Sequence, residues 1–311
     1  MKKALTYTVV TGSLACPNNC EICISKMTPN YGLGAAEPRV DWEQFDKATQ
    51  IAVNYNSRYF LLTSKGEATL FPAQLTKFLH RVEGRPFDRR ELQTEGSTIA
   101  TGGRTYDEFL RVWKDLGLDL VAVSMYHYDD KKNQEAFSQR TPRPYSLEKL
   151  IGQIQSHGLR VRLSCVMLCT YIDSLEEVTR LIDFSKKNGV FQLTIRKADR
   201  PANPLDTFAA SYVDNNRIDS PEFNKELSDF LEKNGKLCDI LPHGASVYEV
   251  SGQNVCMTTG LSTRFSGPKN RKGTENCLQS KPTDDELRQL IFIPPDMLTT
   301  SWENIHGGRI L

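Results

Sequence analysis

Apolar and polar residues follow two different periods along the first two-thirds of the chain. Short apolar runs typical of buried strands occur at 7–11, 58–63, 91–94, 120–126, 160–168 and 191–195. Between most of these runs, apolar residues recur at the spacing of one helix face, as in 40–55, 75–82, 105–116, 146–158 and 174–189. The pattern therefore predicts six strands with helices between them.

Strictly alternating strands and helices favour parallel strands joined by right-handed crossovers. Six such units are short of the eight that close a barrel. We therefore predict an α/β fold, a partial (β/α)6 TIM-like barrel over residues 1–204, with a small C-terminal α+β extension over 205–311 that covers the barrel mouth. In folds of this kind the chemistry lies at the carboxyl ends of the strands.

The last third of the chain follows a less regular pattern. Its local signals predict a loop over 202–217, a helix starting at Ser220-Pro221, a hairpin over 247–257 turning at Ser251-Gly252, a loop over 258–273 and a short helix over 283–290. That last helix is indicated by a capping box from Thr283 to Glu286.

Charge and composition exclude some classes of partner. The chain has 39 basic and 38 acidic side chains, so neither DNA nor an anionic membrane is an expected partner. The N-terminal apolar run alternates with Thr and is broken by Gly12, which argues against a signal peptide. No apolar stretch is long enough to span a bilayer. We therefore expect a cytoplasmic protein, in which cysteines rarely form structural disulfides.

Three of the eight cysteines crowd into one short segment after the first predicted strand. Cys16, Cys20 and Cys23 have the spacing C-x3-C-x2-C, and three thiolates on one loop can each bind one iron of a [4Fe–4S] cubane. A structural zinc site is the alternative, but zinc prefers four protein ligands, and neither a histidine nor a fourth cysteine lies nearby. The segment therefore predicts an iron–sulfur cluster with one iron left open.

This motif resembles the signature of the radical S-adenosylmethionine (SAM) superfamily, and the resemblance extends over roughly residues 5–200. It implies that SAM binds the open iron and that the reduced cluster cleaves SAM to methionine and a 5′-deoxyadenosyl radical, which abstracts hydrogen from a substrate. It also implies an external electron donor of the flavodoxin or ferredoxin type. Ile22 occupies the position that packs against the SAM adenine.

Further segments match secondary motifs of the superfamily. Ser64-Lys65-Gly66-Glu67 stands where the family has Gly-Gly-Glu, with Lys65 in place of the first glycine, and Thr94-Glu95-Gly96 stands where it often has Thr-Asn-Gly. The strand over 160–168 resembles the branch containing the molybdenum-cofactor GTP cyclase. The resemblance implies that the cofactor-binding residues are Ile22, Gly66, Glu67, Thr94, Ser124, Ser164, Val166 and Arg196.

Substrate contacts are expected after the fourth and sixth strands, at Tyr126, His127, Lys197 and Arg200. His127 is either a proton carrier or a capped polar side chain. The basic residues suit a phosphate or carboxylate, unless they are solvated on the surface. Cys238, Cys256 and Cys277 are candidates for a second iron–sulfur cluster, although isolated cysteines are more often small buried apolar residues.

The sequence thus predicts a radical SAM enzyme acting on a small-molecule or nucleotide-type substrate. The chain has no domain ahead of the first strand that would read a leader peptide, so a maturase of a peptide or protein is the second choice. A non-catalytic iron–sulfur electron carrier or sensor is an alternative of another class. An electron carrier needs no SAM pocket, so the secondary motifs favour the enzyme.

Overall fold

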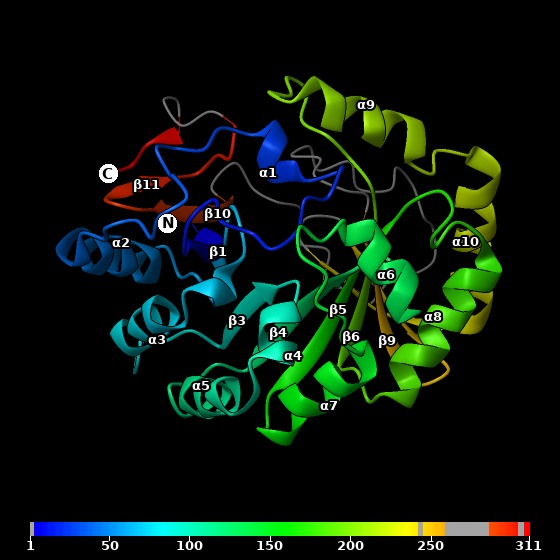
Figure 1. Cartoon of the computed structure of the whole chain (residues 1–311), viewed down its shortest axis with the longest axis horizontal. Coiled ribbons are helices and arrows are strands. Elements are labelled where there is room, and N and C mark those ends of the chain that lie inside the picture. Colours follow the sequence, from blue (N-terminus) through cyan, green and yellow to red (C-terminus); the bar gives the residue numbers. More distant parts are fainter. Residues whose placement is uncertain (1–2, 242–244, 259–285, 304–307) are drawn as a thin grey trace.

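A computed structural model describes residues 3–241, 245–258, 286–303 and 308–311 of the chain (Figure 1). Within these residues, 11 strands form a single sheet in the order β11-β10-β1-β2-β3-β4-β5-β6-β9-β8-β7. The strands are β1 (Lys3–Val10), β2 (Tyr59–Thr63), β3 (Arg89–Thr94), β4 (Leu120–Met125), β5 (Arg160–Met167), β6 (Gln192–Lys197), β7 (Gly235–Ile240), β8 (Ser246–Val250), β9 (Gln253–Thr258), β10 (Glu286–Ile293) and β11 (Met297–Thr299).

The six strands predicted from the sequence, β1 to β6, lie side by side and run parallel. Two further parallel strands extend the sheet, with β10 beside β1 and β9 beside β6. Antiparallel strands lie beyond them, β11 on one side and the pair β8 and β7 on the other. The predicted α/β fold class with a parallel sheet is confirmed.

The helices of the described residues are α1 (Ile24–Met27), α2 (Trp42–Asn54), α3 (Pro72–Arg81), α4 (Ser97–Thr101), α5 (Gly103–Asp115), α6 (Asp130–Phe137), α7 (Leu147–Ser156), α8 (Leu175–Lys187), α9 (Thr207–Asn216) and α10 (Pro221–Asn234). In Figure 1, α3, α5 and α7 lie along the outside of the curved sheet, whereas α1 and α9 lie at the top of the view. The predicted starts of three of these helices are confirmed, because the hydroxyls of Ser146, Ser174 and Ser220 each accept a backbone N–H of their helix. No helix among the described residues is both long and apolar enough to cross a membrane.

The two faces of the parallel sheet differ sharply in polarity. Every second side chain of a strand points toward the helices. On this face the residues are apolar and fully buried, as Leu163 of β5 and Ile195 of β6 are. The intervening residues on the concave face include Arg162, Ser164 and Arg196. Fully buried parallel strands usually carry apolar residues on both faces, so polar residues on the concave face indicate a ligand site.

Two predictions for the last third are wrong. The first is the loop expected over 202–217, which contains helix α9. The Asp206 side chain caps this helix by accepting the backbone N–H of Ala209 at 2.9 Å. Ala209 and Val213 then pack with Met27 of α1. This tertiary contact outweighs the loop-forming asparagines nearby.

The second wrong prediction is the helix over 283–290. Residues 283–285 lie outside the described residues, and from Glu286 onward the chain forms strand β10 between β1 and β11. A capping box is a local signal, whereas Leu290 to Ile293 are fully buried by pairing with strands far away in sequence. The hairpin predicted over 247–257 is confirmed, with Ser251 and Gly252 at positive φ in its turn.

Residues after 204 therefore add strands beside both β1 and β6 of the predicted barrel. The division at residue 204 and a covering role for the extension stay predictions. The expected loop over 258–273 lies, apart from Thr258 at the end of β9, outside the described residues.

We predict that Phe292→Ala lowers the free energy of unfolding by about 3–5 kcal/mol, the usual cost of truncating a buried phenylalanine. The Phe292 ring is fully buried and lies 5.2 Å from the Phe45 ring of α2. Urea unfolding measures the loss, with Phe208→Ala on α9 as control because that ring is 68% exposed. If the two substitutions lower the free energy of unfolding equally, Phe292 of β10 does not belong to the core.

Candidate cluster and ligand site

Residues 11–23, here called the cysteine loop, leave the carboxyl end of β1 and lead into α1. Backbone hydrogen bonds tie this loop to two other segments. Glu67 N–H donates to Ala15 O at 2.9 Å, and Arg140 N–H donates to Pro17 O at 2.9 Å. Asn19 N–H also donates to Phe137 O at 3.2 Å. The loop is therefore fixed between the segment after β2 and the end of α6.

The loop brings together Cys16, Cys20 and Cys23, all partly buried and free. Burial, followed by the charge of Cys23, raises the pKa of Cys20 to about 12. Burial is also the main cause that raises the pKa of Cys16, and the charge of Glu67 adds to it. A thiol with a raised pKa stays protonated at neutral pH, and binding a metal would require it to lose its proton.

Among the described residues, no group of three or more His, Cys, Asp or Glu side chains is placed so as to hold a single metal ion. In a [4Fe–4S] cluster each thiolate binds a different iron, so three thiolates on one loop are suited to such a cluster. A cluster on Cys16, Cys20 and Cys23 stays a prediction.

Gly66, predicted to bind the cofactor, lies where the chain can accommodate no side chain. A Cβ atom at this position would lie 2.1 Å from Ala15 O and 2.7 Å from Ser13 O. Glycine is therefore required because the cysteine loop crosses directly over it. The neighbouring Lys65, which replaces the first glycine of the family motif, is buried and donates from Nζ to Thr28 Oγ1 just after α1.

Glu67 is buried and holds the ends of β2 and β3 together. Its Oε1 accepts the hydroxyls of Thr69 and Thr94, both at 2.6 Å, and the Thr69 N–H at 2.9 Å. Its Oε2 accepts the Glu95 N–H at 2.9 Å. Four donors around one carboxylate are the pattern of an ionised acceptor. Glu67 and Thr94 thus hydrogen-bond to one another and to residues of the segments that follow β2 and β3.

Glu95, at the asparagine position of the family motif, is also buried. Burial and then the charge of Glu67 raise its pKa to about 7. Its Oε1 accepts the Ser97 hydroxyl, while its Oε2 has no hydrogen-bond partner within the part of the chain that the structure describes. The sequence analysis did not predict Glu95 as a site residue. The signal that could have indicated it is the glutamate in place of the asparagine of the family motif.

Four of the predicted cofactor residues line one small cavity on the concave face of the sheet. This cavity has a volume of about 80 Å³ and is lined by Gln93, Ala122, Ser124, Ser164, Val166 and Arg196. Arg196 Nη2 donates to Ser164 Oγ at 2.7 Å. Gln93 and Ala122 were missed, although the two-residue period of β3 and β4 places them on the same face as Arg162. Ile22 lies elsewhere, packed with Met27 and Tyr126.

The predicted substrate residues divide into two groups. Tyr126 and His127 are buried just after β4, and His127 Nδ1 accepts the Asp129 N–H at 2.8 Å, which leaves Nε2 to carry the proton of a neutral ring. Burial and the charge of Lys132 lower the pKa of His127. Arg200 is paired with Asp214 of α9 at 2.8 Å, whereas Lys197 makes no ion pair with any of the described residues.

The structure describes two of the three candidate cysteines for a second cluster. Cys238 is exposed on β7, whereas Cys256 is buried on β9, two strands away. Cys277 lies outside the described residues. A second cluster stays a prediction.

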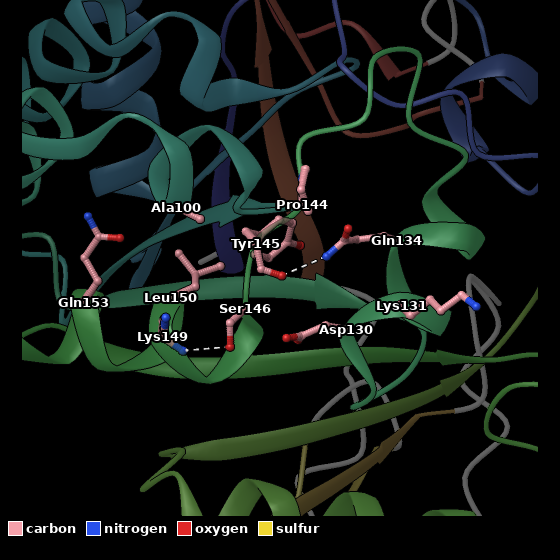
Figure 2. A pocket seen from close by; sticks show the side chains of 10 residues that line it. All are labelled: Ala100, Asp130, Lys131, Gln134, Pro144, Tyr145, Ser146, Lys149, Leu150 and Gln153. Atoms are coloured by element: carbon pink, nitrogen blue, oxygen red, sulfur yellow. Dashed lines mark hydrogen bonds between the residues drawn. The ribbon is translucent and has the colours of Figure 1, made fainter.

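A larger groove, about 660 Å³, lies on the outer surface between α4, α6 and α7 (Figure 2). None of the site residues predicted from the sequence lines this groove. Tyr145 in the wall of the groove contacts the protein interior, because its hydroxyl donates to the backbone oxygen of the buried Glu95 at 3.1 Å. We therefore place the chemistry at the concave face and not in the groove.

Comparison with solved structures shows a shared fold. SuiB of Streptococcus suis bound to S-adenosylmethionine matches 83% of this chain and 51% of its own, with a TM-score of 0.51 and 15% identity. Methylornithine synthase (PylB) matches 74% of this chain and 62% of its own, with a TM-score of 0.50 and 12% identity.

A radical SAM methyltransferase of Sphaerobacter thermophilus matches 73% of this chain and 63% of its own, with a TM-score of 0.50 and 15% identity. No family model and no curated protein matches the sequence. The chain spans about half of the length of SuiB. The protein is therefore an α/β partial barrel of the architecture seen in these three proteins.

We predict that Glu67→Ala lowers the free energy of unfolding by about 3 kcal/mol, because four buried donors lose a charged acceptor. Urea unfolding of the protein measures this change. Glu37→Ala is the control, since Glu37 is exposed and its removal should cost less than about 0.5 kcal/mol. If Glu67→Ala lowers the free energy of unfolding by no more than the control does, Glu67 does not hold the ends of β2 and β3 together.

Proposed function

We propose that this protein is a radical SAM enzyme, with a [4Fe–4S] cluster on Cys16, Cys20 and Cys23 and SAM bound between the cluster and the concave face. The observation that carries the proposal is the position of the cysteine loop. It lies at the carboxyl end of β1, with its backbone against the Gly66–Glu67 segment. In barrels of parallel strands this end carries the catalytic groups.

The cluster and SAM together would supply a one-electron reductive cleavage that yields a 5′-deoxyadenosyl radical able to abstract hydrogen. The protein's own residues hold and orient the two groups. Cys16, Cys20 and Cys23 would hold the cluster, the backbone around Gly66 would bind the SAM methionyl group, and Ser124, Ser164, Val166 and Arg196 would bind other parts of SAM. Buried apolar side chains such as Met27 exclude water beneath the cysteine loop.

The concave face supports an enzyme over an electron carrier. A carrier needs a cluster near the surface, whereas this sheet also directs uncommon polar side chains, Ser164 and Arg196 among them, at an interior cavity. We propose a small-molecule or nucleotide-type substrate, reached past Tyr126, His127 and Lys197. We further propose an external flavodoxin- or ferredoxin-type protein as the source of the electron, and a cytoplasmic location.

We predict that Ala at any one of Cys16, Cys20 and Cys23 abolishes 5′-deoxyadenosine formation. After anaerobic reconstitution, the wild type should hold about four irons and four sulfides per chain, as one cubane requires, and the triple variant none. The measurement is iron and sulfide content, together with 5′-deoxyadenosine released from SAM under dithionite.

Cys169→Ala is the matched control, because Cys169 is a free, partly buried cysteine that lies outside the cysteine loop. This variant should keep both the irons and the SAM cleavage. If the triple variant still cleaves SAM, the proposed function is wrong. About four irons remaining in that variant would assign a second cluster to the last third of the chain.

A further inference from the structure

The interior of a parallel barrel is normally filled by large branched side chains arranged in layers. On the concave face of this sheet, Ala122 and Ser124 of β4 lie beside Arg162 and Ser164 of β5. Thr194 of β6 continues the same row. Small residues leave space and polar residues line it, so this face is built to receive a polar ligand and not to pack.

Two arginines of this face have donors left over. Arg196 lines the cavity, whereas Arg162 lies beside Ala122, which lines it. Arg162 pairs through Nη2 with Glu91 of β3, and only 17% of its side chain and 10% of that of Glu91 are exposed. Arg196 donates through Nη2 to the neutral hydroxyl of Ser164. The Nε atoms of both arginines are buried and have no hydrogen-bond partner among the described residues. An unpartnered N–H of a guanidinium is costly inside a protein unless a ligand accepts it.

The charges of Arg162, Arg196 and Glu91 do not balance. The two arginines contribute two positive charges, and Glu91 contributes one negative charge. Burial lowers the pKa of Arg196, and the nearby charge of Arg162 lowers it further. Within this group of three side chains one positive charge is left over, and one anionic group of a ligand would neutralise it.

We propose that Arg162 and Arg196 form a receptor for a carboxylate or phosphate group of the substrate, inside the barrel. Planar guanidinium groups bind both oxyanions through paired N–H donors, and the two unpartnered Nε atoms supply such donors. The substrate is thereby assigned to the anionic small molecules, which rests on the proposed function and deepens it.

The depth of Arg162 favours the substrate over SAM as the source of the oxyanion. Along β5, Arg162 precedes Ser164 by two residues and Val166 by four, on the same face. It therefore lies further from the cysteine loop than the residues proposed to contact SAM. Arg196 has enough N–H donors to contact both molecules, but Arg162 is reached only by a ligand that extends below SAM.

The test measures anion binding to the reconstituted protein with SAM bound, through its thermal midpoint. Inorganic phosphate and acetate are the probes, each against chloride at equal ionic strength. The test variant is the double substitution Glu91→Gln/Arg162→Gln, which removes the pair together and leaves no lone buried charge. Arg160→Gln is the matched control, because Arg160 lies on the same strand and face but pairs with Asp119 and stacks 4.1 Å from the Phe191 ring.

We expect phosphate or acetate to raise the thermal midpoint of the wild type and of Arg160→Gln. In the double variant and in Arg196→Gln, the apparent anion affinity should fall at least about tenfold, the usual effect of losing a charge-assisted hydrogen bond. The SAM affinity of the double variant should stay within about threefold of wild type, since Arg162 lies below the SAM contacts. The stronger probe identifies a phosphate or a carboxylate as the substrate group.

Two results would overturn the proposal. The first is anion stabilisation that is absent in the wild type or unchanged in the double variant. The second is a loss of SAM affinity in the double variant of about tenfold or more, which would identify the SAM carboxylate as the anion bound. Failure of the proposed function is a different result. In that case the wild type forms no 5′-deoxyadenosine from SAM, whether or not it binds phosphate.

Discussion

The site depends on one contact, between the cysteine loop and the segment that follows β2. Ala15 O accepts the Glu67 N–H, and the same carbonyl lies so close to Gly66 that no Cβ fits between them. Glu67 then passes this constraint to β3 through its hydrogen bonds to Thr94 and the Glu95 N–H. Two loops far apart in sequence are thereby held as one unit, so the cysteines are positioned by strands and not by the loop alone.

The sheet separates stability from chemistry by the two-residue period of its strands. Along β5, Val161, Leu163 and Cys165 face the helices and are fully buried, whereas Arg162 and Ser164 face the concave side. Apolar burial on one face stabilises the fold without constraining the residues on the other. Polar and small side chains can therefore be placed on the concave face, where a packed barrel would have branched apolar ones.

This division explains how much could be predicted from the sequence. Local signals such as the Ser174 cap, the turn at Ser251-Gly252 and the period of β5 depend on neighbours in the chain, and the structure confirms them. Strand β10 could not be predicted, because its partner β1 lies more than half the chain away. The cysteines were found by their spacing, whereas Arg162 was overlooked because its ion pair with Glu91 joins strands that are not neighbours.

Some of the hydrogen bonds that the fold leaves unmade lie on the polar concave face. Among the described residues, ten buried side-chain atoms have no partner, and four of them are Thr8 Oγ1, Glu95 Oε2 and the Nε atoms of Arg162 and Arg196. Thr8 and both arginines face the concave side, by the register of the parallel strands, and Glu95 follows β3 at its carboxyl end. Folded proteins rarely leave such atoms unpaired, because each costs free energy. A ligand bound on the concave face would supply partners for atoms of this group, accepting from the arginines below the cysteine loop and donating to Glu95 beside it.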